Sequence, residues 1–171
     1  MRDFRSIMHI IGILLCIESF AMIIPLITDL VFKNSDWEVF FLSSLLTFFI
    51  GLVLYYSFRK EKILIKIRQA FVLTILSWII IAFFASLPFV FTSANLNYTD
   101  SFFESISGIT TTGATVIKEL DNLHHGILIW RSLLQWFGGI GIIVLAMAIL
   151  PTLQIGGMQL LHMEQDDPYE K

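Results

Sequence analysis

Residues 102–115 read FFESISGITTTGAT and join a short apolar pattern to three threonines and a glycine. The apolar residues recur at helical spacing, which predicts a helix of about two to three turns. They are Phe102, Phe103, Ile106 and Ile109. Ser101 and Glu104 have the spacing of a capping box at the start of this helix. Because a bilayer crossing takes about 20 residues, the helix is too short to span a membrane.

The composition of the whole chain is typical of a membrane protein. Of its 171 residues 56% are hydrophobic and only 15% are charged, whereas soluble domains are about a quarter charged. Four apolar runs are long enough to cross a bilayer as helices, at about residues 7–30, 39–58, 70–91 and 127–150. The sequence therefore predicts a multi-pass membrane protein with four crossings.

Charge patterning predicts the orientation. Residues 59–68, between the second and third crossings, carry five basic side chains, and the positive-inside rule places such a loop in the cytoplasm. By alternation, both chain ends are cytoplasmic and residues 92–126 lie outside. The short helix and the threonine run fall within this long outer segment. The expected fold is an all-α membrane protein whose transmembrane helices surround a re-entrant pore helix and an extended filter loop.

Several functional classes are excluded by what the sequence contains. The net charge is −3 and the basic residues do not gather on a helix, which argues against nucleic acid as a partner. Cys16 is the only cysteine, so the chain has no disulfide framework. There is no nucleophile elbow, metal-ligand pair or glycine-rich phosphate loop, and we expect neither enzymatic activity nor a cofactor.

The threonine run suits potassium coordination. A K⁺ filter replaces the hydration shell of the ion with backbone carbonyls, and a glycine such as Gly113 can adopt the positive φ that turns a carbonyl without a Cβ clash. The carboxyl end of the short helix, near Gly108, would add a partial negative charge that favours a cation. Read alone, Thr110–Gly113 fits an ordinary threonine-rich turn equally well. Its place between a short helix and the fourth crossing favours a filter.

Residues 102–115 resemble the first pore loop of the Trk/Ktr/HKT superfamily of potassium transporters, in its TrkH/TrkG branch. The resemblance continues in order along nearly the whole chain. It includes SLPF at 86–89, QWFGGIGIIVLA at 135–146, Leu150-Pro151 and GGMQL at 156–160.

The resemblance implies an architecture of four membrane-pore-membrane repeats about a pseudo-fourfold axis, preceded by two extra helices. It implies that residues 1–66 hold the extra helix pair and the basic loop. Residues 67–151 would form the first repeat, with its pore loop at about 99–116, and residues 152–171 a cytoplasmic tail leading to the next repeat. A filter needs four such loops, so we expect a fragment of a longer transporter; assembly with other chains stays open.

The same resemblance implies potassium uptake across the bacterial inner membrane, with K⁺ as the transported ion. The filter ligands would be carbonyls of Thr111, Thr112 and Gly113, with Ala114 close by, and Glu104 and Thr110 would support them. Glycine at 113 favours K⁺ over Na⁺. The implied partners are the lipid bilayer, the remaining repeats, a second copy of the transporter and a cytosolic TrkA-like RCK regulatory subunit. Whether uptake is passive or a symport with H⁺ or Na⁺ stays open.

Two other functions remain alternatives. One is a subunit of an oligomeric K⁺ channel, although such channels use a TVGYG-type filter where this chain has TTGAT. The other is a membrane accessory protein that transports nothing.

Some single residues are ambiguous. Glu18 lies within the first crossing, where a local polar contact or a protonated side chain is more plausible than ion coordination. We expect Arg131 to anchor the fourth crossing with its stem reaching toward water, rather than to line the pathway. His124 and His125 are expected to be solvated. The glycines of the fourth crossing would allow close packing or a bend of the pore wall; they are Gly138, Gly139 and Gly141.

Overall fold

The computed structural model describes residues 2–59, 67–118, 120–143 and 147. In this part of the chain there is no β-strand, and four helical segments are long and apolar enough to cross a membrane. These segments are Phe4–Val31, Trp37–Ser57, Gln69–Phe91 and His125–Ile143, the last of which we call the fourth span. The predicted all-α membrane fold with four crossings is confirmed. The basic loop at 60–66 and the tail after 147 lie outside the described residues.

The first crossing is built from two helices, α1 (Arg2–Ala21) and α2 (Ile23–Val31). The break at Met22 has a local cause, because Pro25 lacks the amide hydrogen that would bond the carbonyl of Ala21 four residues earlier, and its ring crowds that carbonyl. The hydrogen bonds on either side of the break survive, from Met22 N to Glu18 O at 3.1 Å and from Leu26 N to Met22 O at 3.3 Å.

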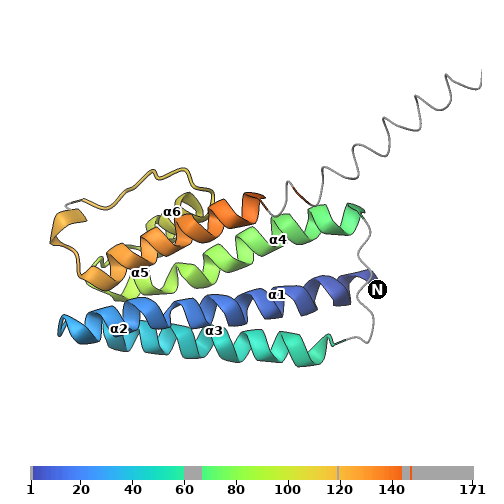
Figure 1. Ribbon diagram of the computed structural model, residues 1–171, viewed down its shortest axis with the longest axis horizontal. Helices are drawn as coiled ribbons and strands as arrows, with labels where there is room; N and C mark the ends of the chain where they lie inside the picture. The colour runs from blue at the N-terminus through green and yellow to red at the C-terminus, as the bar shows by residue number, and fades with distance from the viewer. Residues whose placement is uncertain (1, 60–66, 119, 144–146, 148–171) are drawn as a thin grey trace, which may run out of the picture.

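The second crossing, α3 (Trp37–Ser57), runs back along α1 and α2 (Figure 1). Two glycines allow the backbones to touch, since a Cβ on Gly12 would lie 2.8 Å from the carbonyl oxygen of Gly51. Small residues at a helix crossing are the usual means of close packing in membranes. Ser44 Oγ also donates to the carbonyl of Ser19 across this contact, at 2.8 Å.

The third crossing comprises α4 (Ile67–Ala85) and the short α5 (Leu87–Phe91). The helix α6 (Tyr98–Ile109) and the 3₁₀ turn η1 (Leu120–Asn122) lie between this crossing and the fourth span. The main hydrophobic core joins all of these parts; its largest fully buried side chains include Met22, Phe40, Phe89 and Trp130. Trp130 Nε1 donates to the carbonyl of Ala85 at 3.0 Å, which ties the fourth span to α4.

Candidate functional site: the loop after α6

Helix α6 begins one turn earlier than the sequence suggested. Asn97 is its N-cap: Asn97 Oδ1 accepts from the amide of Asp100 at 2.9 Å, and Asn97 Nδ2 donates to Asp100 Oδ2 at 2.8 Å. The predicted capping box of Ser101 and Glu104 is therefore wrong. Both lie inside the helix, since the pair at 97 and 100 has the same spacing and takes the cap. Glu104 is thereby left available for another contact.

The carboxyl end of α6 packs against the middle of the fourth span. A Cβ on Gly108 would lie 3.0 Å from Leu134 Cβ, and a Cβ on Gly138 would overlap the carbonyl oxygen of Ile109. Gly138 is 13 residues into the fourth span, or about 20 Å along it at 1.5 Å per residue. Helix α6 therefore lies beside the fourth span rather than beyond its amino-terminal end, as Figure 1 also shows.

The chain reverses direction after α6. Thr111 N bonds Gly108 O at 2.9 Å, and the next two amides, of Thr112 and Gly113, both point back to Ser107 O at 3.0 and 3.3 Å. Gly113 has φ of +74°, as predicted from its place in the threonine run. Thr111 has φ of +57°, which was not predicted, because a β-branched residue rarely adopts this conformation.

This reversal leaves the carbonyls of the loop free. With the amides turned toward α6, the carbonyl oxygens of Thr111, Thr112 and Gly113 accept no hydrogen bond from the described residues. All residues from 111 to 116 are exposed. The carbonyl of Ala114 differs, because Ser107 Oγ donates to it at 2.6 Å and so draws it toward α6.

Hydroxyl groups brace the start of the loop. Thr110 Oγ1 donates to Ile106 O at 2.7 Å and lies 2.8 Å from Thr112 Oγ1. A threonine hydroxyl has one hydrogen, so Thr112 must be the donor of the second contact. The expected support by Thr110 thus has a structural basis, although its effect on an ion stays a prediction.

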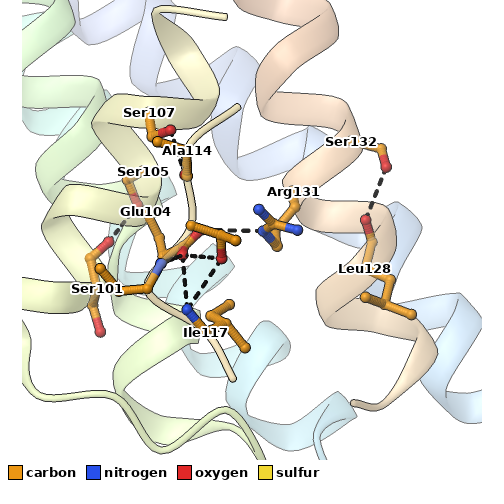
Figure 2. A network of polar contacts seen from close by, with 11 residues as sticks. Ser101, Glu104, Ser105, Ser107, Ala114, Ile117, Leu128, Arg131 and Ser132 are labelled. Atoms are coloured by element: carbon orange, nitrogen blue, oxygen red, sulfur yellow. Dashed lines mark hydrogen bonds and ion pairs between the residues drawn. The ribbon is translucent and has the colours of Figure 1, made fainter. Parts of the chain in front are cut away.

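Glu104 holds the far end of the loop (Figure 2). Its side chain is almost fully buried, and Oε1 accepts from Thr115 Oγ1 at 2.5 Å and from Val116 N at 2.7 Å. The amide of Ile117 lies 3.3 Å from the same oxygen. Glu104 was expected to support the loop, and these contacts show that its carboxylate accepts hydrogen bonds from residues 115–117; its effect on an ion stays a prediction.

The partner of Glu104 is a residue whose contact the sequence did not reveal. Arg131 Nε donates to Glu104 Oε2 at 3.1 Å, with 17% of the arginine side chain and 1% of the glutamate side chain exposed. The expectation that Arg131 anchors the helix by reaching toward water is corrected, since it is directed at the buried carboxylate beside the loop (Figure 2). No local spacing signals this pair, because it joins residues 27 positions apart.

Three other polar residues were singled out from the sequence, and the structure allows their predicted surroundings to be compared with the observed ones. Glu18 is 5% exposed, and neither of its carboxylate oxygens has a hydrogen-bond partner among the described residues. Of the two alternatives for Glu18, a local polar contact is therefore not found, and a protonated side chain stays a prediction. His124 is bonded to Asp36, with 2.8 Å between Nδ1 and Oδ2, and His125 stacks on Phe32 with ring centroids 4.0 Å apart. The expectation of a solvated side chain is therefore wrong for His124, which is half-buried against Asp36, whereas His125 is exposed as expected.

Acidic and histidine side chains do not gather into a metal centre in the described ranges, where no group of three or more His, Cys, Asp or Glu could hold an ion. The loop after α6 offers a different kind of ligand, because its backbone carbonyls at Thr111, Thr112 and Gly113 accept no hydrogen bond from the described residues. Carbonyl oxygens suit an ion that sheds its water at low cost and passes on.

Comparison with known proteins points to a single family. The family model described as TrkH, cation transport protein, matches residues 37–170. The Trk system potassium uptake protein TrkH of Escherichia coli K12 is 46% identical over 166 residues, covering 96% of this chain and 34% of that protein. TrkG of the same organism is 36% identical, with 97% and 34% covered.

A solved structure agrees with the sequence comparison. The crystal structure of the potassium transporter TrkH from Vibrio parahaemolyticus superposes with a TM-score of 0.82 at 44% identity, covering 90% of this chain and 33% of that one. The chain thus spans about a third of the length of the relatives it matches. A family model that matches most of the chain, together with these relatives, leads to one conclusion: the chain belongs to the TrkH family of cation transport proteins.

Proposed function

We propose that this chain takes part in potassium uptake across the bacterial inner membrane and supplies one of the four loops of a selectivity filter. The observation that carries the proposal is that Thr111, Thr112 and Gly113 are exposed and that their carbonyls accept no hydrogen bond from the described residues. These three residues follow a short helix that lies beside a membrane span. The choice of potassium as the ion rests on the names of the matched relatives, which are potassium uptake proteins and a potassium transporter.

The geometry accounts for cation attraction. Helix α6 ends at Ile109, so its partial negative pole, about half an elementary charge, lies next to the loop. A potassium ion at the loop would exchange water oxygens for carbonyl oxygens. The amides of Thr112 and Gly113 are already bonded to Ser107 O, which fixes the side of the backbone that faces the ion. A re-entrant loop of this kind requires a water-filled path on its exposed side.

One loop cannot surround an ion, so the remaining repeats would provide the other ligands. We assign residues 1–66 to the extra helix pair, 67–151 to the first repeat and 152–171 to the link toward the second. The fourth span supports this assignment, because it exposes large apolar side chains beyond the loop that another repeat would cover. These are Trp136, Ile140 and Ile143.

In the inner membrane both ends of the chain would face the cytoplasm, with the basic residues 59–68 on the same side. A second copy of the transporter and a TrkA-like RCK subunit on the cytosolic face are the partners that the family likeness suggests. An oligomeric channel formed by this chain alone would be an alternative source of four loops.

The filter assignment is tested at Gly113 in the transporter that contains the other repeats. A side chain at φ of +74° is strained by about 1–2 kcal/mol, so Gly113→Ser is expected to disturb the adjacent carbonyls before it disturbs folding. We expect a lower preference for Rb⁺ or K⁺ over Na⁺ in uptake assays, at near-normal protein levels. Gly113→Asp should abolish uptake.

Thr115→Ser is the matched control, because it keeps the hydroxyl that bonds Glu104. If Gly113→Ser left selectivity unchanged, or if lost uptake followed lost protein, the filter assignment would fail. Expression of this chain alone tests the channel alternative: we expect insertion without rescue of a K⁺-uptake-deficient strain at low K⁺, and rescue would favour the oligomer.

A further inference from the structure

Asp36, in the turn before α3, makes contacts with both ends of the segment that carries α6 and its loop. Its Oδ2 accepts from the amide of Ser93 at 3.0 Å and lies 2.8 Å from His124 Nδ1. Ser93 precedes α6 and His124 follows the loop. A single carboxylate oxygen on the first helix pair thus brings together the two ends of a 32-residue segment, counted from 93 to 124.

Asp29, near the end of α2, makes a second contact of the same kind. Its Oδ1 accepts from Gly126 N and from Asn34 Nδ2, both at 2.9 Å, and the residue is fully buried. Gly126 lies in the first turn of the fourth span, so a carboxylate from another helix caps this helix where the macrodipole favours negative charge. A Cβ at Gly126 would overlap the Asp29 carboxylate, which explains the glycine.

We propose that Asp29 and Asp36 form an outer clamp through which the first helix pair positions the pore loop. The clamp consists of these two aspartates and the three residues that they contact after α5, which are Ser93, His124 and Gly126. Asp29 lies near the end of α2 and Asp36 directly before α3, and these two helix ends lie together at one end of the molecule (Figure 1). The hydrogen bonds of Asp36 reach Ser93 and His124, and that of Asp29 reaches Gly126, so the two aspartates hold the residues that flank the loop at 110–117.

The clamp has a physical purpose. Bringing the two ends of a long loop together costs conformational entropy. The hydrogen bonds of the clamp offset this cost, so the loop can stay ordered although its middle is open to water. Hydrogen bonds to a charged acceptor are stronger than neutral ones, and these bonds are largely shielded from solvent. Glu104 holds the loop from within the same repeat, whereas the clamp holds its ends from outside the repeat.

The test uses Asp36→Ala in the complete transporter, with Glu38→Ala as the matched control. Glu38 is an exposed acid two residues away in the first turn of α3. Hydrogen exchange of peptides covering 93–97 and 110–117 is expected to accelerate at least about tenfold in Asp36→Ala and to stay unchanged in Glu38→Ala. The KM for Rb⁺ uptake should rise with protein abundance maintained.

Hydrogen exchange tests the clamp by itself, whereas the KM for Rb⁺ uptake also rests on the proposed function of the loop. The two measurements therefore distinguish failure of the clamp from failure of the proposed function. Faster exchange with unchanged KM and selectivity would support the clamp and refute the role of this loop in transport. Unchanged exchange at both peptides would overturn the clamp whatever the uptake. If Asp36→Ala did not accumulate, His124→Ala removes one end of the clamp and is judged by the same exchange measurement.

A conservative variant tests the hydrogen bond itself. Asp36→Asn keeps an oxygen that can accept from the Ser93 amide, so it should restore most of the protection at 93–97. Exchange as fast as in Asp36→Ala would show that this hydrogen bond does not hold the loop, and the clamp would be wrong.

Discussion

Replacing Arg131 with methionine should expose how much the loop depends on its buried ion pair. The change removes the guanidinium that lies 3.1 Å from Glu104 Oε2 and keeps a long apolar stem. Glu104 would then hold a charge in a site where 1% of its side chain is exposed, and breaking a buried pair in this way costs about 3–5 kcal/mol. The other oxygen of this carboxylate, Oε1, accepts hydrogen bonds from Thr115 Oγ1 and Val116 N, so the loop should loosen as well.

Arg131→Met is combined with a second change, Glu104→Gln, in a double-mutant cycle. A glutamine removes the charge but still offers an oxygen to the amide of Val116, and Arg131, at 17% exposure, can turn part of its guanidinium to water. We therefore expect Glu104→Gln to cost less than Arg131→Met, about 1–3 kcal/mol. The double variant should cost less than the sum of the two, because neither charge is left without its partner.

The measurement is thermal unfolding of the purified complete transporter in detergent, together with the K⁺ to Na⁺ preference of uptake. Ser132→Ala is the neighbouring control, since the hydroxyl of this exposed residue only bonds the Leu128 carbonyl of its own helix. If Arg131→Met were no worse than Ser132→Ala, or if the two changes simply added, the ion pair would not be what stabilises the loop.

Two further predictions concern packing and orientation. Gly138→Ala places a methyl group on the carbonyl of Ile109, and this overpacking should lower the free energy of unfolding by about 1–3 kcal/mol and reduce uptake. Gly139→Ala is the control and should be tolerated, because a Cβ at this position meets nothing within 4 Å. Equal effects of the two changes in a thermal-shift assay would contradict the packing of α6. For orientation, an impermeant thiol reagent applied to intact cells should label Ser35→Cys and spare Lys62→Cys, and labelling of position 62 from outside would reverse the topology.

The sequence determined the features that depend on neighbours along the chain. Four crossings follow from the length of the apolar runs, because lipid requires each spanning segment to satisfy its own backbone. The short α6 and the positive φ of Gly113 follow from spacing and from the conformational freedom of glycine. One local feature was predicted wrongly: both Asn97 and Ser101 are residues that can cap a helix, and the structure has Asn97 as the N-cap of α6.

Only the tertiary structure decided which polar groups meet. Glu104 and Arg131 are 27 positions apart, Asp36 and His124 are 88 apart, and Asp29 reaches Gly126 across 97 positions. Residues so far apart in sequence carry no shared spacing. From the sequence alone, Glu104 was interpreted as a support, Arg131 as an anchor and His124 as a solvated side chain, and the two aspartates were not singled out. Tertiary packing imposes these pairings: the packing of α6 against the fourth span brings Glu104 to Arg131, and the packing of α2 and α3 against the start of the fourth span brings the aspartates to His124 and Gly126.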